Sequence, residues 1–199
     1  MVKVIGITGL MGSGKSFISA LLNMEGGIKY NMDVVAKSVQ MKSKDLKDKI
    51  IAKFGEKYYN GFVINVEYAK ALYFAGTDES KENLKWINET IQPYIIENFE
   101  HFKKIVSDDY PYIIVESAIL FETGFHKYCD YIIGVKSPNP IMKTYERDYT
   151  TKEEWQIRMA SQLPESEKSF DFIISNDYTN NVEKQVVELH KQIMLKIQN

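Results

Sequence analysis

Short apolar runs alternate along this chain with stretches of helical periodicity. The apolar run over 2–7 opens the sequence, and four further runs are rich in β-branched and aromatic residues, at 27–31, 112–116, 130–135 and 172–175. Apolar runs of this length, separated by helical patterns, predict parallel strands that are covered on both faces. Because crossovers between parallel strands are right-handed, the pattern predicts a three-layer α/β/α fold with a five-stranded parallel sheet. Ligands are expected beyond the carboxyl ends of these strands.

Two helical stretches interrupt this alternation. The first, about 62–106, is almost entirely helical over 65–74 and 78–106, and Pro93 is expected to interrupt its second part. Its many aromatic residues favour either a helical layer packed on the core or a second wall over a ligand site. The other stretch, about 140–165, carries Lys143, Arg147, Lys152 and Arg158, which suit either a solvated face or a mobile lid. We therefore expect one domain over 1–199, with a core over 1–61, 107–139 and 166–199, a helical insertion and a lid.

Composition narrows the class of protein. The 199 residues are 44% hydrophobic and 26% charged, which is typical of a globular domain. A formal net charge of −2 offers no electrostatic case for nucleic acid or an anionic membrane as a partner, and no apolar stretch is as long as a membrane span. Cys129 is the only cysteine, which favours a reducing, cytoplasmic location and a small core residue over a reactive nucleophile. The three histidines lack metal-ligand spacing.

The segment from Gly9 to Ser16, GLMGSGKS, fits the pattern G-x-x-x-x-G-K-[ST]. It follows an apolar run and precedes a helical pattern, which is the context of a phosphate-binding loop rather than of a simple turn. The glycines allow successive backbone N–H groups to converge on an anion at the positive end of a helix. In such a loop Lys15 reaches the β- and γ-phosphates of a nucleotide, and the Ser16 hydroxyl can bind Mg²⁺.

Two carboxylates follow predicted strands. Asp33 lies just after the second strand, where it is either a helix N-cap or a base that deprotonates an attacking hydroxyl. Glu116 ends the third strand, where it either holds a Mg²⁺-bound water or serves as a structural cap. The N-K-x-D and D-x-x-G patterns of GTPases are missing from the sequence. These features favour a small-molecule kinase.

In the order of several separate motifs, the chain resembles the dephospho-CoA kinase family over most of its length. The opening strand and loop match, and 33–37 (DVVAK) is similar to the second half of the family's D-A-D-x-[IV]-A-[RK] signature. The segment 118–122 (AILFE) stands where the family has P-L-L-F-E. Arg147-Asp148, Arg158 with Gln162, and 171–176 (DFIISN) follow the family's R-D, R-x-x-x-Q and D-x-[IV]-I-x-N order.

The resemblance implies that the ATP γ-phosphoryl group is transferred to the ribose 3′-hydroxyl of dephospho-CoA, which gives CoA and ADP. Asp33 would be the base, Arg147 would come from the lid to meet the transferring group, and Arg158 would line the closed lid. Asn176 would lie near adenine, and Glu116 would act on Mg²⁺ through water. The helical insertion would receive the CoA precursor. The remaining ATP-binding residues would come from the loop: Gly9, Met11, Gly12, Ser13, Gly14, Lys15, Ser16 and Phe17.

Several positions depart from the family pattern. Asn31 replaces the first Asp of the signature, and Leu10 replaces a loop glycine. The other departures fall on the acceptor side, at Val66, Lys70, Gln92 (where His-Pro is usual) and Ala118. Two alternatives therefore stay open, a nucleoside or nucleotide kinase with a different acceptor pocket and a non-catalytic nucleotide-binding protein.

Overall fold

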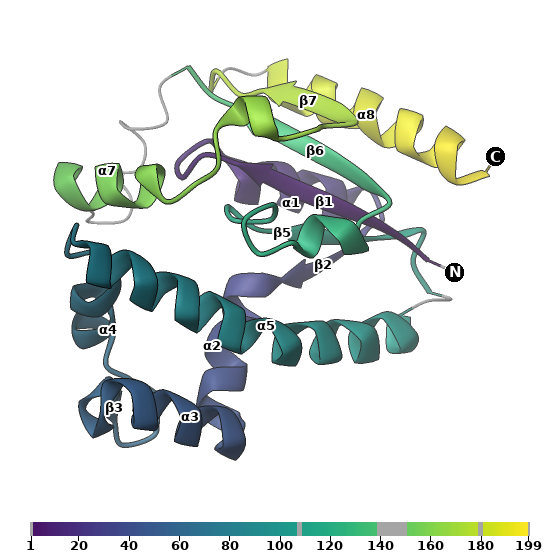
Figure 1. Cartoon of the computed structure of the whole chain (residues 1–199). Helices are drawn as coiled ribbons and strands as arrows, with labels where there is room; N and C mark the ends of the chain where they lie inside the picture. The colour runs from purple at the N-terminus through teal and green to yellow at the C-terminus, as the bar shows by residue number, and fades with distance from the viewer. Residues whose placement is uncertain (1, 107–108, 139–150, 179–180, 199) are drawn as a thin grey trace.

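The computed structural model describes residues 2–106, 109–138, 151–178 and 181–198. At its centre lies a five-stranded sheet in the order β2-β5-β1-β6-β7 (Figure 1). The strands are β1 (Lys3–Gly9), β2 (Ile28–Asn31), β5 (Tyr112–Glu116), β6 (Tyr131–Lys136) and β7 (Phe172–Ser175). Every neighbouring pair is parallel. The predicted parallel α/β fold is thus confirmed, and the first, second and fourth strands each begin one residue later than expected.

Helices cover both faces of the sheet. On one face, α1 (Lys15–Met24) and α8 (Asn181–Gln198) enclose a core that includes Tyr112 and Ile114 of β5. The alternate residues of β5, Ile113 and Val115, belong to the core on the other face, against α5 (Asp78–Val106). Both sets are buried, which is why β5 reads as a continuous apolar run in the sequence.

A group of helices extends from the second face (Figure 1). It contains α2 (Met32–Lys42), α3 (Lys44–Phe54), η1 (Glu56–Tyr58), the short hairpin β3 (Tyr59–Asn60) and β4 (Val63–Ile64), and α4 (Val66–Tyr73). The Phe54 ring lies 5.2–5.8 Å from the rings of Tyr58, Tyr73 and Trp86. Many aromatic residues of the predicted insertion therefore build a packed layer, and α3 joins them from earlier in the chain.

Helix α5 runs without a break through Pro93, so the predicted interruption is wrong. A proline inside a helix removes one backbone hydrogen bond and costs about 3 kcal/mol. Buried residues spaced four apart, Ile87, Ile91, Ile95 and Phe99, anchor the helix on both sides of the proline. Packing of this stripe against the core outweighs the local cost.

The segment after β5 crosses the second face of the sheet and returns to the start of β6 through η2 (Phe125–Tyr128). Leu120 and Cys129 pack over Gly6, where a Cβ would come within 3 Å of both side chains. Burial raises the pKa of the Cys129 thiol to about 12, which agrees with a core residue rather than a nucleophile. The later elements are α7 (Lys152–Ala160) and η3 (Glu165–Glu167). None of the helices in the described ranges is long and apolar enough to cross a membrane.

Candidate active site

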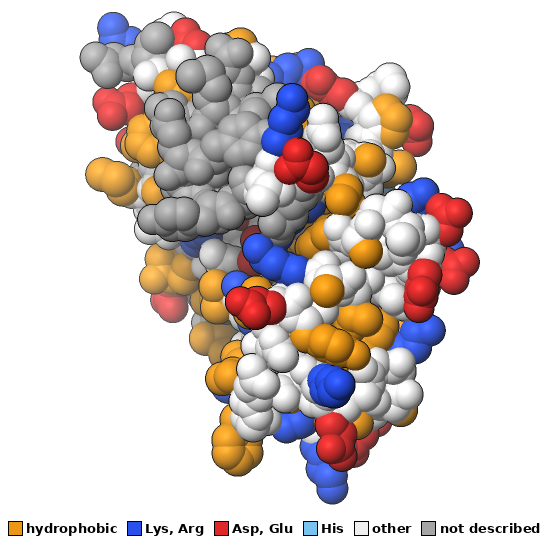
Figure 2. Space-filling model, turned by 90° about the vertical axis from the view of Figure 1, so that its left-hand side faces the viewer, with side chains coloured by type: hydrophobic (Ala, Val, Ile, Leu, Met, Phe, Trp, Pro, Cys, Tyr) orange, Lys and Arg blue, Asp and Glu red, His pale blue; other side chains and the backbone are white. Residues whose placement is uncertain are grey.

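The glycine-rich loop joins β1 to α1 at the carboxyl edge of the sheet. Gly14 adopts a φ of 89° at the N-cap of α1, and a Cβ there would come 2.0 Å from the Asn176 side-chain nitrogen. At Gly9 a Cβ would come 2.3 Å from the backbone oxygen of Val135. Both positions require glycine, because neither the backbone angle at Gly14 nor the space at Gly9 admits a side chain. The face that carries this edge has a central hollow with charged side chains at its margin (Figure 2).

Lys15 is buried at the first position of α1, with 9% of its surface exposed. Its ammonium group donates hydrogen bonds to the backbone oxygens of Gly9 (3.1 Å) and Leu10 (2.8 Å). Burial lowers the pKa of Lys15 to about 8, although Glu116 and Asp33 act in the opposite direction. A bound anion would offset the cost of burying this charge, because it favours the protonated ammonium group. The site therefore suits a phosphate.

Ser16, Glu116 and Lys29 form a contiguous polar group beside the loop. The Ser16 hydroxyl donates to Glu116 Oε1 at 2.5 Å, and Lys29 Nζ lies 2.5 Å from Glu116 Oε2. Burial alone would raise the pKa of Glu116, but the hydrogen bonds from Lys29 and Ser16 outweigh burial and keep the pKa below its usual value. The carboxylate therefore stays charged, held by Lys29 and close to the Ser16 hydroxyl.

Hydroxyl and carboxylate oxygens are the ligand types that Mg²⁺ prefers, usually together with waters and substrate phosphates. Ser16 and Glu116 supply one of each within hydrogen-bond distance, so the pair fits such an ion. Among the described residues there is no cluster of three or more His, Cys, Asp or Glu side chains of the kind that holds a metal without help from a substrate.

Asp33 lies in the first turn of α2, directly after β2. It is not the N-cap, because the Asn31 side chain accepts the Val34 N–H at 3.1 Å and fills that role. Desolvation by the surrounding protein, and then the charge of Glu116, raise the pKa of Asp33, while Lys15 acts in the opposite direction. A carboxylate that has a raised pKa and does not cap the helix suits the acceptance of a proton.

The turn after β7 braces the loop from the other side. Asn176 is 2% exposed, and its side-chain nitrogen donates to the backbone oxygen of Ser13 at 2.8 Å. Tyr178 donates its hydroxyl to the backbone oxygen of Gly12 and adopts a φ of 63°. Its role could not be recognised from the sequence because it depends on that left-handed turn. The contact of Lys29 with Glu116 had a signal, since a lysine inside a buried strand usually has a charged partner.

Arg158 reaches the site from α7. Its guanidinium carbon lies 4.6 Å from the centre of the Phe74 ring, and Nη1 lies 3.7 Å from the Met11 sulfur. Arg158 therefore connects the segment after 151 with the loop and with the end of α4. Arg147, expected to meet the transferring phosphoryl group, lies outside the described residues. Phe17, in the first turn of α1, is half exposed beside the loop.

These residues come together at one edge of the sheet, as predicted for the ends of β1, β2, β5 and β7. The sequence and fold of the chain were compared with those of known proteins. The family model described as "Dephospho-CoA kinase" matches residues 3–182.

Curated relatives carry the same name. A dephospho-CoA kinase from Fusobacterium nucleatum is 32% identical over 182 residues, covering 88% of this chain and 90% of that protein. One from Bacteroides fragilis is 30% identical, covering 97% of this chain and 94% of that protein. Among solved structures, a dephospho-CoA kinase from Campylobacter jejuni has a TM-score of 0.66 at 21% identity, covering 98% of this chain and 99% of that one. The chain belongs to the dephospho-CoA kinase family.

Proposed function

We propose that this enzyme uses the edge formed by Lys15, Ser16, Asp33 and Glu116 to move the γ-phosphoryl group of ATP onto the ribose 3′-hydroxyl of dephospho-CoA. The juxtaposition of the phosphate loop with Asp33 carries the proposal. Asn31 caps α2 in place of Asp33, so the carboxylate is available to the acceptor hydroxyl.

The chain's own groups suit each part of this transfer. The loop N–H groups and the Lys15 ammonium hold the phosphates, and Asn176 keeps the loop backbone in position. Asp33 accepts the 3′-hydroxyl proton while the oxygen bonds to the γ-phosphorus and the bond from that phosphorus to the ADP oxygen breaks. When bound, Mg²⁺ would neutralise charge on the phosphates, held by Ser16 and by Glu116 through a water.

Arg158 is proposed to close the site from α7, next to Met11 of the loop. Closure of this kind excludes water, which otherwise competes with the acceptor hydroxyl. Arg147 is proposed to act on the transferring group, as the family resemblance implies.

The test is ADP release from Mg·ATP with dephospho-CoA, AMP, adenosine or no acceptor. We expect release that depends on dephospho-CoA and on Mg²⁺, and a product with the mass of CoA. Asp33→Asn should lower kcat by about 10²–10⁴-fold while binding of a non-hydrolysable ATP analogue stays within about twofold of the original protein. Turnover with adenosine or AMP but not with dephospho-CoA would refute the proposed acceptor, and an unimpaired Asp33→Asn would refute the base.

A further inference from the structure

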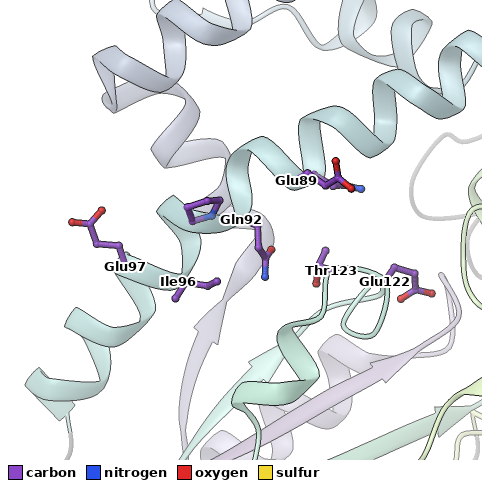
Figure 3. Close-up of a pocket in the computed structure, with 8 residues that line it drawn as sticks. Glu89, Gln92, Ile96, Glu97, Glu122 and Thr123 are labelled. Carbon is purple, nitrogen blue, oxygen red and sulfur yellow. The ribbon is translucent and has the colours of Figure 1, made fainter.

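A cavity of about 540 Å³ lies between the middle of α5 and the segment that follows β5. Its lining includes Gln92, Pro93 and Ile96 from α5, and Glu122 and Thr123 from the opposite side. Figure 3 shows the Gln92 side chain extending from α5 toward Thr123, while the Glu122 carboxylate points away from α5. The volume is within the range of ligand pockets, about 300–1,000 Å³.

Both walls of the cavity are connected to elements that carry residues of the candidate active site. The Tyr30 hydroxyl, in the strand that leads to Asn31 and Asp33, donates to the backbone oxygen of Ile95 at 3.2 Å and so fixes α5 over β2. The opposite wall belongs to the segment that begins directly after Glu116. A substrate whose hydroxyl lies at Asp33 can therefore extend between α5 and this segment.

The lining selects against phosphate. Glu89 and Glu97 contribute carboxylates, whereas the Glu122 carboxylate points away from α5 and is paired with Lys168 at 3.0 Å (Figure 3). None of the described residues that line the cavity is a lysine or arginine. None of them is aromatic either, so the cavity lacks the flat surface on which an adenine ring stacks. The remaining side chains are aliphatic, amide or hydroxyl groups, which suit a neutral chain with amides.

Gln92 adds a specific requirement. Its side-chain oxygen is buried and has no hydrogen-bond partner among the described residues. A buried acceptor without a partner costs about 1–3 kcal/mol, so native structures rarely leave one unsatisfied. A ligand that fills this cavity should therefore present an N–H or O–H donor to Gln92.

We propose that this cavity binds the pantetheine arm of the acceptor, with an amide N–H donated to Gln92 and the dimethyl group against Pro93 and Ile96. The inference rests on the proposed function, since it assigns the nucleotide part and the pantetheine arm of dephospho-CoA to two different parts of the site. The ribose lies at Asp33, and the neutral arm lies between α5 and the Thr123 segment. Gln92 is thus a specificity residue, at the position where the family resemblance has His-Pro.

The experiment measures KM for dephospho-CoA and the inhibition constants of two fragments that compete with it at saturating ATP. AMP carries the adenosine without the arm, and pantetheine is the arm alone. Gln92→Leu removes the acceptor oxygen at nearly constant volume, and Ile96→Trp fills the cavity. Gln192→Leu, the same change at an exposed position of α8, is the matched control.

We expect Gln92→Leu to raise KM for dephospho-CoA and the inhibition constant of pantetheine by about tenfold, the loss of one hydrogen bond. Ile96→Trp should raise both further, while the constant for AMP stays within twofold in either variant. Unchanged KM in Gln92→Leu, equal losses for AMP and pantetheine, or no competition by pantetheine would overturn the inference. A protein that does not phosphorylate dephospho-CoA at all would instead overturn the proposed function, and the inference with it.

Discussion

Asn31 and Asp33 divide two tasks that a single aspartate often combines. The Asn31 side chain accepts a hydrogen bond from the Val34 N–H at the start of α2. The carboxylate of Asp33, two residues later, is therefore available for the reaction. The departure from the family signature at Asn31 is therefore structurally neutral, because asparagine caps helices about as well as aspartate does.

This division predicts that position 31 affects stability more than chemistry. Asn31→Ala should lower the free energy of unfolding by about 1 kcal/mol, the usual cost of losing an N-cap. Asn31→Asp should retain the original stability, and both variants should keep kcat within a few fold. Denaturant unfolding and ADP release measure the two effects. A loss of turnover in Asn31→Ala as large as that in Asp33→Asn would contradict the assignment.

The lowered pKa of Lys15 predicts a pH dependence of nucleotide binding. Free Lys15 titrates with a pKa of about 8, and bound phosphates raise that pKa because they favour the charged ammonium. Below the free pKa the lysine is already protonated and Kd is flat. Above it, binding takes up a proton, and Kd for an ATP analogue should rise by up to about tenfold per pH unit.

Calorimetry in buffers of different ionisation enthalpy measures both Kd and this proton uptake. Lys15→Arg is the control, because arginine stays charged and the dependence should disappear even if binding is weaker. A Kd that does not change between pH 8 and pH 9 would show that the ammonium group is not the titrating ligand.

At the scale of elements, the start of α1 and the end of β7 form one unit. Asn176 and Tyr178 both bond backbone oxygens of the loop, at Ser13 and Gly12, and Gly14 leaves room for the Asn176 amide. The geometry of the loop thus depends on a segment at the other end of the chain.

A pair of glycine substitutions tests this unit. Gly14 and Gly26 both have positive φ, 89° and 108°, but a Cβ at Gly26 would meet nothing within 4 Å. Gly26→Ala should cost only about 1 kcal/mol of backbone strain and leave ATP binding intact. Gly14→Ala should have the same backbone strain and should also displace the Asn176 side chain. We therefore expect it to weaken binding of an ATP analogue by at least about tenfold. Equal binding by the two variants would rule out the bracing role of Asn176.

The apolar runs predicted the strands because parallel strands are buried on both faces, as Ile113 and Ile114 are. The motif likewise predicted the positions of Lys15 and Ser16, since a strand and a helix hold that loop locally. The bonds from Asn176 to Ser13 and from Tyr178 to Gly12 join residues more than 160 positions apart, and local pattern carries no information about such contacts. The continuity of α5 through Pro93 was unpredictable for a related reason, because tertiary packing of its buried stripe overrides propensity.

At the scale of the molecule, three parts meet at Arg158. The sheet contributes the loop with Met11, the helical group contributes Phe74 at the end of α4, and α7 contributes the guanidinium between them. Ile157 of α7 also lies beside Gly76, close to the start of α5. The position of α7 over the site therefore depends on its contacts with the loop and with the helical group.

A double-mutant cycle on Phe74 and Arg158 tests whether these contacts act together. Phe74→Leu removes the ring face, and Arg158→Lys keeps the charge but loses the planar group that stacks on it. Each single variant should lower kcat/KM for dephospho-CoA, and the double variant should lose about 3–30-fold less than the product of the two losses. This coupling is expected because the second change removes a contact that the first has already broken. Strictly multiplicative losses would mean that Arg158 serves the nucleotide through the loop alone, and that the helical group does not position α7.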